Sequence, residues 1–248
     1  MEPIHPLGMA HFLAQTDVVG KTLLVILVAM SIATWYLIVV KSLQMLSARR
    51  RTGRFLATFW NAPSLQAVER ELDARPPDEA FSRLAYHAIA ASKHHARHGE
   101  NGLAAAGGSS EFLTRALRRV IDDETARLET GLAVLASVGS TAPFVGLFGT
   151  VWGVYHALVN IGMSGHGTLD KVAGPVGEAL IMTALGLAVA IPAVLAYNAF
   201  VRRNRVVLAQ LDAFAHDLFA FLTTGRHVAE AQRAATPSPM PKTVEGVA

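Results

Sequence analysis

Three long apolar stretches constrain this 248-residue chain more than any other feature of its sequence. They cover residues 22–40, 131–161 and 172–201, and a helix needs roughly 20 predominantly apolar residues to cross a bilayer core. The composition, 52% hydrophobic and 17% charged, also favours a membrane protein over a soluble domain. The sequence therefore predicts an all-α membrane protein with three transmembrane helices and long cytoplasmic helical extensions.

The first apolar stretch is predicted to be a lipid-facing anchor. It carries no charge, Lys21 and Lys41 bracket it, and Trp35 and Tyr36 lie toward one end, as in an interfacial belt. A cleaved signal peptide is the alternative, but it requires a basic region before the apolar stretch. Here the basic residues mostly follow the stretch, so we expect the segment to be retained.

The second and third stretches contain more small residues, which favours packed helices over a simple anchor. Gly149 and Gly153 stand at GxxxG spacing, which lets two helix backbones approach closely. Pro143 interrupts the second stretch and Pro192 the third. Each proline frees a carbonyl one turn earlier, and such kinks are tolerated where neighbouring helices or cavity water satisfy that group.

Basic residues predict the orientation of the spans. They cluster after the first stretch, before the second and after the third, whereas the opposite side holds Lys21 and Lys171 near the span ends. Because cytoplasmic loops carry the excess of Lys and Arg, the N-terminus is expected outside and the C-terminus in the cytoplasm. The clustered residues are Lys41, Arg49, Arg50, Arg51, Arg54, Arg115, Arg118, Arg119, Arg127, Arg202, Arg203 and Arg205.

The rest of the chain divides around these spans. The pattern predicts an outer N-terminal segment, a cytoplasmic helical segment, an outer loop, a cytoplasmic helix and a disordered tail. These segments are residues 1–21, 41–130, 162–171, 202–230 and 231–248, in that order.

Within residues 41–130, helices are expected after the N-cap candidates Ser64 and Asp78. A Gly/Ala/Ser stretch at 99–110 indicates a loop, and a helix from Glu111 to Thr130 is expected to run straight into the second span. After Asp78, apolar residues recur at helical spacing and predict a buried face, formed by Phe81, Leu84, Ala85, Ala88 and Ile89.

Glu178 is the one charged residue of the third stretch and the first candidate for chemistry. Ionisable groups inside a membrane span are costly and mark functional sites, and burial raises a carboxyl pKa toward values that suit proton exchange. The alternative is that the helix starts near Pro175, which would make Glu178 an acidic residue favoured by the helix dipole.

Three threonines are further candidates, because a hydroxyl both donates and accepts hydrogen bonds and can hold water or a proton in a pore. They are Thr141, Thr150 and Thr183. The commoner role of such a hydroxyl is a bond to a carbonyl one turn earlier. Glu178 and Thr183 are five residues apart and diverge by roughly 140° on an ideal helix, so both face one lumen only if the helix packs between two neighbours or is distorted.

Several function classes lack support in the sequence. Cysteine is absent, which excludes disulfides and thiolate chemistry. The cluster His94, His95 and His98 has metal-ligand spacing, but no HExxH motif accompanies it, and an exposed helix end is the simpler reading. No GxGxxG, P-loop or GxSxG motif occurs, and the charge of +3 does not indicate nucleic acid. We therefore expect no enzyme, cofactor or metal site.

Two runs carry a resemblance to a known family. The run GSTAPFVGLFGTVWGV (139–154) and the run GEALIMTALGLAVAIPAVLAYN (177–198) together closely resemble the MotA/TolQ/ExbB proton-channel family, and its ExbB branch in particular. The resemblance covers the second and third spans, and the three-span layout agrees with it. One departure is the order Gly174–Pro175, where the family commonly reads Pro-Gly.

The resemblance implies a homopentamer in the inner membrane of a Gram-negative cell, assembled as a ring around a lumen. An ExbD-like single-span subunit would sit in that lumen, and the complex would use the proton-motive force to energise a TonB-like transducer. The family's lumen glutamate falls on Glu178 and its lumen threonines on Thr150 and Thr183, with Thr141 as a further candidate.

Two alternatives remain at this stage. A TolQ-like subunit of the Tol-Pal envelope system would carry similar motifs. A non-conducting membrane scaffold would use the small residues for packing only, with Glu178 as a helix-start residue.

Overall fold

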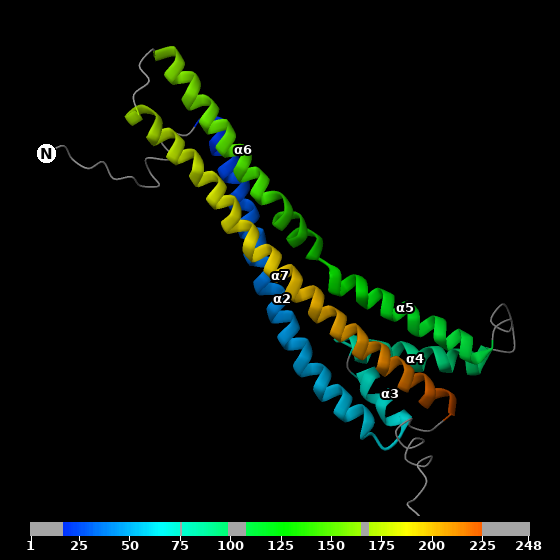
Figure 1. Ribbon diagram of the computed structural model, residues 1–248. Helices are drawn as coiled ribbons and strands as arrows, with labels where there is room; N and C mark the ends of the chain where they lie inside the picture. Colours follow the sequence, from blue (N-terminus) through cyan, green and yellow to red (C-terminus); the bar gives the residue numbers. More distant parts are fainter. Residues whose placement is uncertain (1–16, 75, 99–107, 165–168, 225–248) are drawn as a thin grey trace, which may run out of the picture. The chain divides into compact units, whose positions relative to one another are not determined.

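The computed structural model describes residues 17–74, 76–98, 108–164 and 169–224, and these are helical almost throughout (Figure 1). The predicted tail at 231–248 and most of the predicted loop at 99–110 lie outside the described residues. The described helices are α2 (Val18–Trp60), α3 (Leu65–Ala74), α4 (Ala80–His98), α5 (Ser109–Glu129), α6 (Leu132–Ser164) and α7 (Leu169–Thr224). No strand occurs among the described residues, so the predicted all-α class is confirmed for them.

Three helical stretches of the described chain are long and apolar enough to cross a membrane. They are Val18–Trp60, Ser110–Met163 and Ala179–Thr224. Each contains most of one of the three stretches that the sequence predicts as spans. The structure therefore contains, as the sequence predicts, three helical stretches that could cross a membrane.

The chain divides into two compact units, and α2 and α7 contribute to both. The spanning unit comprises residues 1–46 and 129–204, and the polar unit comprises residues 47–128 and 205–248. Each unit has its own apolar core, and each is described by itself below.

The spanning unit packs the first part of α2 against α6 and the first part of α7 (Figure 1). Its core mixes large side chains such as Leu135 and Phe200 with alanines. Many of its large apolar residues, such as Phe144 and Leu195, are instead exposed on the single chain, as expected of surfaces that meet lipid or other subunits. The buried core residues are Leu27, Leu132, Leu135, Val138, Ala142, Met182, Val189, Ala190, Ala193 and Phe200.

The polar unit packs around aromatic rings. Phe59 of α2 and Phe214 of α7 meet edge to face, with their ring centroids 5.3 Å apart, and Trp60 lies 4.8 Å from Phe59. Such pairs contribute roughly 0.5–1.5 kcal/mol beyond their area burial. The face predicted from helical spacing in α4 is confirmed, because its five residues Phe81, Leu84, Ala85, Ala88 and Ile89 are all buried.

A buried ion pair joins α4 to α5 in the same unit. The Arg83 guanidinium donates to both oxygens of Glu124, at 2.5 and 2.6 Å, and the Glu124 side chain is only 4% exposed. The hydrogen bond to Glu124 raises the pKa of Arg83 above its ordinary value, against the opposing effect of burial. A bidentate, charge-assisted pair of this kind fixes the orientation of the two helices as well as their distance.

The two predicted helix caps have different outcomes. Ser64 caps α3 as predicted, since its Oγ accepts from the Ala67 N–H at 3.2 Å. The cap of α4 is Glu79 rather than Asp78: its Oε1 accepts from the Ser82 N–H at 2.8 Å, and its own N–H donates to Ser82 Oγ at 3.3 Å. Asp78 instead pairs with Arg51 of α2, so a tertiary ion pair takes the residue that local sequence marks as the cap.

The helix predicted to continue from Glu111 into the second span is broken. α5 ends at Glu129 and α6 begins at Leu132, and Gly131 between them has φ of 82°. A glycine takes this left-handed conformation at little cost, which is why helices commonly end there. A Cβ on Gly131 would also lie 3.1 Å from Leu37 of α2, so the break coincides with a close helix contact.

The helix that contains the third predicted stretch, residues 172–201, begins before it, and it continues into the predicted cytoplasmic helix. α7 starts at Leu169 and runs without interruption to Thr224. Pro175 therefore lies inside the helix and Glu178 nine residues after its start. The alternative that made Glu178 a first-turn residue is wrong.

Candidate functional site

The seam between α6 and α7 is the closest helix contact of the spanning unit. Gly146 and Gly186 face each other there, and a Cβ on Gly146 would lie 2.6 Å from the Met182 carbonyl oxygen. The reverse also holds, since a Cβ on Gly186 would lie 2.7 Å from the Ala142 carbonyl oxygen. Both obstacles are backbone atoms, so neither position accepts a side chain without a shift of the helices.

The predicted GxxxG pair lies on the same seam. A Cβ on Gly149 would meet Met182 at 2.9 Å, and one on Gly153 would meet the Ala179 Cβ at 3.0 Å. Sequence reasoning identified this pair but missed Gly146 and Gly186, which make the tighter contacts. The spacing of Gly146, Gly149 and Gly153 on one helical face is the signal that identifies them together.

The seam brings two of the three predicted threonines together. The hydroxyl oxygens of Thr150 on α6 and Thr183 on α7 lie 2.5 Å apart. The Thr150 hydroxyl also lies 2.9 Å from the Ala179 carbonyl oxygen and 3.2 Å from that of Gly146. Because one hydroxyl has a single proton, Thr150 donates to one of these acceptors at a time, and Thr183 is able to donate to it in turn.

This arrangement differs from ordinary packing of threonine in a helix. A solitary helical threonine bonds to the carbonyl one turn earlier, and Thr150 has that option at Gly146. It has in addition two partners on a different helix, and both threonines are partly buried. The pair is therefore an interhelical polar contact in which a hydroxyl proton has alternative acceptors.

Thr141 does not join the pair. Its hydroxyl donates to the Ser137 carbonyl oxygen at 2.7 Å, one turn earlier on α6, and the residue is exposed on the single chain. This is the commoner role of a membrane-helix threonine.

Glu178 immediately precedes Ala179, whose carbonyl accepts from Thr150. Its backbone lies within α7, but its side chain is outside the described residues. Pro143 and Pro192 both lie within continuous helices, α6 and α7. Glu178 is therefore the sequence neighbour of Ala179, a residue whose carbonyl contacts Thr150.

The histidines of α4 do not form a metal site among the described residues. The rings of His94 and His95 stack on Phe112 of α5, with centroid distances of 6.3 and 5.7 Å. The side chain of His98 lies outside the described residues.

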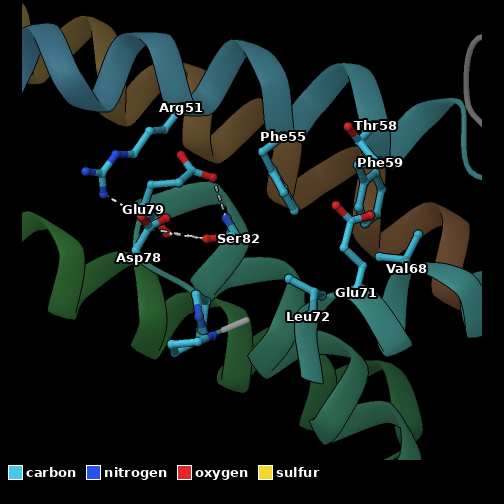
Figure 2. Close-up of a pocket in the computed structure, with 12 residues that line it drawn as sticks. Arg51, Phe55, Thr58, Phe59, Val68, Glu71, Leu72, Asp78, Glu79 and Ser82 are labelled. Carbon is cyan, nitrogen blue, oxygen red and sulfur yellow. Dashed lines mark hydrogen bonds and ion pairs between the residues drawn. The ribbon is translucent and has the colours of Figure 1, made fainter. Parts of the chain in front are cut away.

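A pocket of about 120 Å³ in the polar unit is the other candidate (Figure 2). Phe55 and Phe59 line it from α2, Leu72 lines it from α3, and Glu79 is the buried carboxylate at its edge. Burial raises the pKa of Glu79, although hydrogen bonds from Thr52 and from the backbone of α4 act in the opposite direction.

Both oxygens of Glu79 are already used within the protein. Oε1 accepts from the Ser82 N–H at 2.8 Å and Oε2 accepts from the Thr52 hydroxyl at 2.5 Å. Figure 2 shows the carboxylate directed at Ser82. The carboxylate therefore joins α2 to the start of α4, and we assign it a structural role.

Comparison with known proteins bears on the seam directly. Residues 78–213 match the MotA/TolQ/ExbB proton channel family, a range that contains α6, the threonine pair and Glu178. The chain is 46% identical to the biopolymer transport protein ExbB of Xanthomonas campestris over 85% of its length and 84% of that protein. It is 44% identical to ExbB of Neisseria meningitidis over 78% of its length and 87% of that protein.

A second kind of relative is more distant. The chain is 33% identical to the Tol-Pal system protein TolQ of Pseudomonas aeruginosa, over 93% of its length and the whole of that protein.

Proposed function

The chain belongs to the MotA/TolQ/ExbB proton channel family, and from this premise we propose that Glu178, Thr150 and Thr183 form its part of a proton path. It is a transport component and not an enzyme. The observation that carries the proposal is the 2.5 Å contact between the two threonine hydroxyls across the α6–α7 seam.

The chemistry of the three residues suits this role. A carboxyl inside an apolar span is costly to keep charged, so it exchanges protons more readily near neutral pH than an exposed carboxyl does. The threonine hydroxyls donate and accept at once, and they have partners on both helices. They are therefore able to hydrogen-bond a passing proton or water while carrying no charge of their own. Thr141 is a secondary candidate, since it is exposed on the single chain and is therefore accessible to another subunit packed against α6.

The assembly proposed for this chain is a homopentamer in a bacterial inner membrane, with its N-terminus in the periplasm and its C-terminus in the cytoplasm. The ring of α6 and α7 helices encloses the single-span helix of an ExbD-like subunit, which supplies a second acidic residue. Moving one charge through 100 mV releases about 2.3 kcal/mol, enough to bias a modest rotation or piston step of that partner. A TonB-like transducer then carries the motion to outer-membrane transporters.

The higher identity to ExbB than to TolQ, 46% against 33%, favours the transport role over envelope constriction. A TolQ-like role is the second candidate, because the match to TolQ covers 93% of this chain. A strain that lacks its own ExbB and a strain that lacks its own TolQ separate the two roles by which of them the chain restores.

The test of the proton path is Glu178→Gln, which keeps the volume and hydrogen bonding of the side chain but cannot titrate. We expect it to abolish uptake of TonB-dependent substrates at normal protein levels. Glu129→Gln is the matched control, because Glu129 is an exposed glutamate at the end of α5. Wild-type uptake by Glu178→Gln would remove Glu178 from the path and leave the chain as a scaffold.

A further inference from the structure

The residue before α2 makes a contact that no motif explains. Asp17 caps α2 in the usual way, because its Oδ1 accepts from the Gly20 N–H at 2.8 Å. Its Oδ2 accepts from the indole N–H of Trp152 at 2.6 Å, although Trp152 lies 135 residues later on α6. One carboxylate thus fixes the start of α2 and a turn of α6 together.

The environment keeps this carboxylate ionised. Burial alone raises the pKa of Asp17, but the hydrogen bonds from Trp152 and Gly20 and the charges of His156 and Lys21 outweigh it and hold the pKa below its usual value. A hydrogen bond to a charged acceptor is stronger than one to a neutral acceptor, so ionisation of Asp17 strengthens this exposed contact.

Neighbouring rings on α6 also contact the Trp152 ring. His156, one turn later on α6, places its ring 4.5 Å from that of Trp152, and its Nδ1 lies 3.2 Å from the Trp152 carbonyl oxygen. Phe148, one turn earlier, lies 6.3 Å from the indole. These contacts leave the indole little freedom to turn away from Asp17.

Trp152 belongs to the same turn of α6 as Thr150. Side chains two residues apart on a helix diverge by about 160°, so Trp152 and Thr150 lie on nearly opposite sides of α6. Thr150 and Gly153 make contacts with α7, at Thr183 and Ala179. A rotation of α6 that breaks the Asp17 contact also moves Thr150 away from Thr183.

We propose that Asp17 is a positioning residue for the proton path: its bond to Trp152 sets the rotation of α6 at which Thr150 meets Thr183. This rests on the function proposed above for the threonine pair. Asp17 itself takes no proton in transport; it holds α2 and α6 in one register while the partner helix moves.

Disulfide trapping tests the geometry, and the absence of native cysteine makes the result unambiguous. In a Thr150→Cys/Thr183→Cys chain, the rate of cross-linking by a mild oxidant reports how often the two positions meet. We expect Asp17→Asn and Trp152→Phe each to slow cross-linking by about fivefold or more, since each weakens or removes a charge-assisted hydrogen bond. The combination is expected to be no slower than the slower single variant, because both act on one contact.

Thr22→Val is the matched control. Thr22 lies one turn after Val18, the first residue of α2, and among the described contacts its exposed hydroxyl bonds only to the Val18 carbonyl oxygen, at 2.8 Å. It is expected to leave cross-linking unchanged. Trp152→Phe keeps an aromatic ring against His156, so a general loss of packing at Trp152 would not account for its effect.

Transport supplies the second readout, measured in chains that retain both threonines. We expect Asp17→Asn and Trp152→Phe to lower the maximal uptake rate at unchanged half-saturating substrate concentration. Unchanged cross-linking in both variants, or lower uptake with unchanged cross-linking, would overturn the proposal. If Glu178→Gln transports normally, the proposed function fails, whereas the positioning role of Asp17 is then decided by the cross-linking rates alone.

Discussion

The spanning unit and the polar unit hold their helices together with opposite kinds of side chain. In the spanning unit the closest contact is between two glycines, Gly146 and Gly186, whose added Cβ atoms would meet backbone oxygens at 2.6 and 2.7 Å. In the polar unit the centre is the aromatic group around Phe59 and Phe214, supported by the buried Arg83–Glu124 pair.

The difference follows from the surroundings. In water, large apolar side chains gain most from burial, and charged pairs add orientation. In lipid, an apolar side chain gains little by leaving the tails, so helices associate through close backbone contact and hydroxyl bonds. Where two helix backbones are in such close contact, the backbones fix the positions of the side chains between them. The contact between Thr150 and Thr183 depends on positions that are fixed in this way.

Among substitutions that test this difference between the two units, the largest loss of stability is expected in the polar unit. Arg83→Ala leaves the Glu124 carboxylate buried, and among the described residues its contact with Arg127 at 3.5 Å is still present. The loss is expected to be about 3–5 kcal/mol in the free energy of opening of α4 and α5, measured by hydrogen exchange. Exchange in α6 should not change by a comparable amount if the units are held by separate contacts.

Two further variants sharpen that result. Arg115→Ala removes the exposed pair with Glu111, in which both side chains are more than 60% exposed, and should cost at most about 0.5 kcal/mol. Arg83→Met combined with Glu124→Leu removes both charges and should recover most of the loss. Failure of that recovery would mean that the pair supplies stability beyond the penalty of an orphaned charge.

The next effect in size lies at the seam. Gly146→Ala places a Cβ against the Met182 carbonyl oxygen, so α6 and α7 must separate. We expect the free energy of unfolding, measured in a denaturing detergent, to fall by about 1–3 kcal/mol. Gly162→Ala on the same helix is the control, because nothing lies within 4 Å of its added Cβ. It should be neutral or stabilise by about 0.5–1 kcal/mol. Equal behaviour of the two variants would contradict glycine packing as the basis of the spanning unit.

Local sequence predicted well what depends on short-range pattern. The three apolar stretches, the Ser64 cap and the apolar face of α4 follow from composition and helical period, and the structure contains them. The threonines were identified as candidates, but their meeting across two helices depends on rotation of the helices, which periodicity does not determine.

What sequence could not supply are contacts between distant residues. Arg51 pairs with Asp78, which leaves the cap of α4 to Glu79, and Asp17 reaches Trp152 over 135 residues. The break at Gly131 was also missed, because a helix pattern with one glycine is compatible with continuation. At Asp78 a tertiary contact takes the place of the local cap, whereas Asp17 keeps its local cap and adds a distant contact.

The smallest effect concerns Glu79, a carboxylate placed in the polar unit at a cost. It is 5% exposed, and burial raises its pKa above the ordinary value of 4.5 despite the hydrogen bonds from Thr52 and Ser82 and the charge of Arg83. An acid whose pKa is higher in the folded than in the unfolded state binds more protons when folded. Its contribution to stability is therefore present below pH 4.5 and is lost as the pH rises through the raised folded pKa.

Glu79→Gln isolates this contribution, because glutamine keeps an oxygen for the Ser82 N–H and offers an amide toward Thr52 but does not titrate. We expect the opening free energy of α4 in the unaltered chain to fall as the pH rises from about 4.5, and that of Glu79→Gln to fall less, so that the variant is the more stable one at neutral pH. Hydrogen exchange in α4, corrected for the intrinsic pH dependence of amide exchange, measures both.

Glu71→Gln is the matched control, since Glu71 lines the same pocket but is exposed. If Glu79→Gln were less stable than the unaltered chain at neutral pH, the charge of Glu79 would strengthen the cap of α4 by more than its burial costs. The polar unit would then depend on an ionised carboxylate, whereas we expect it only to tolerate one.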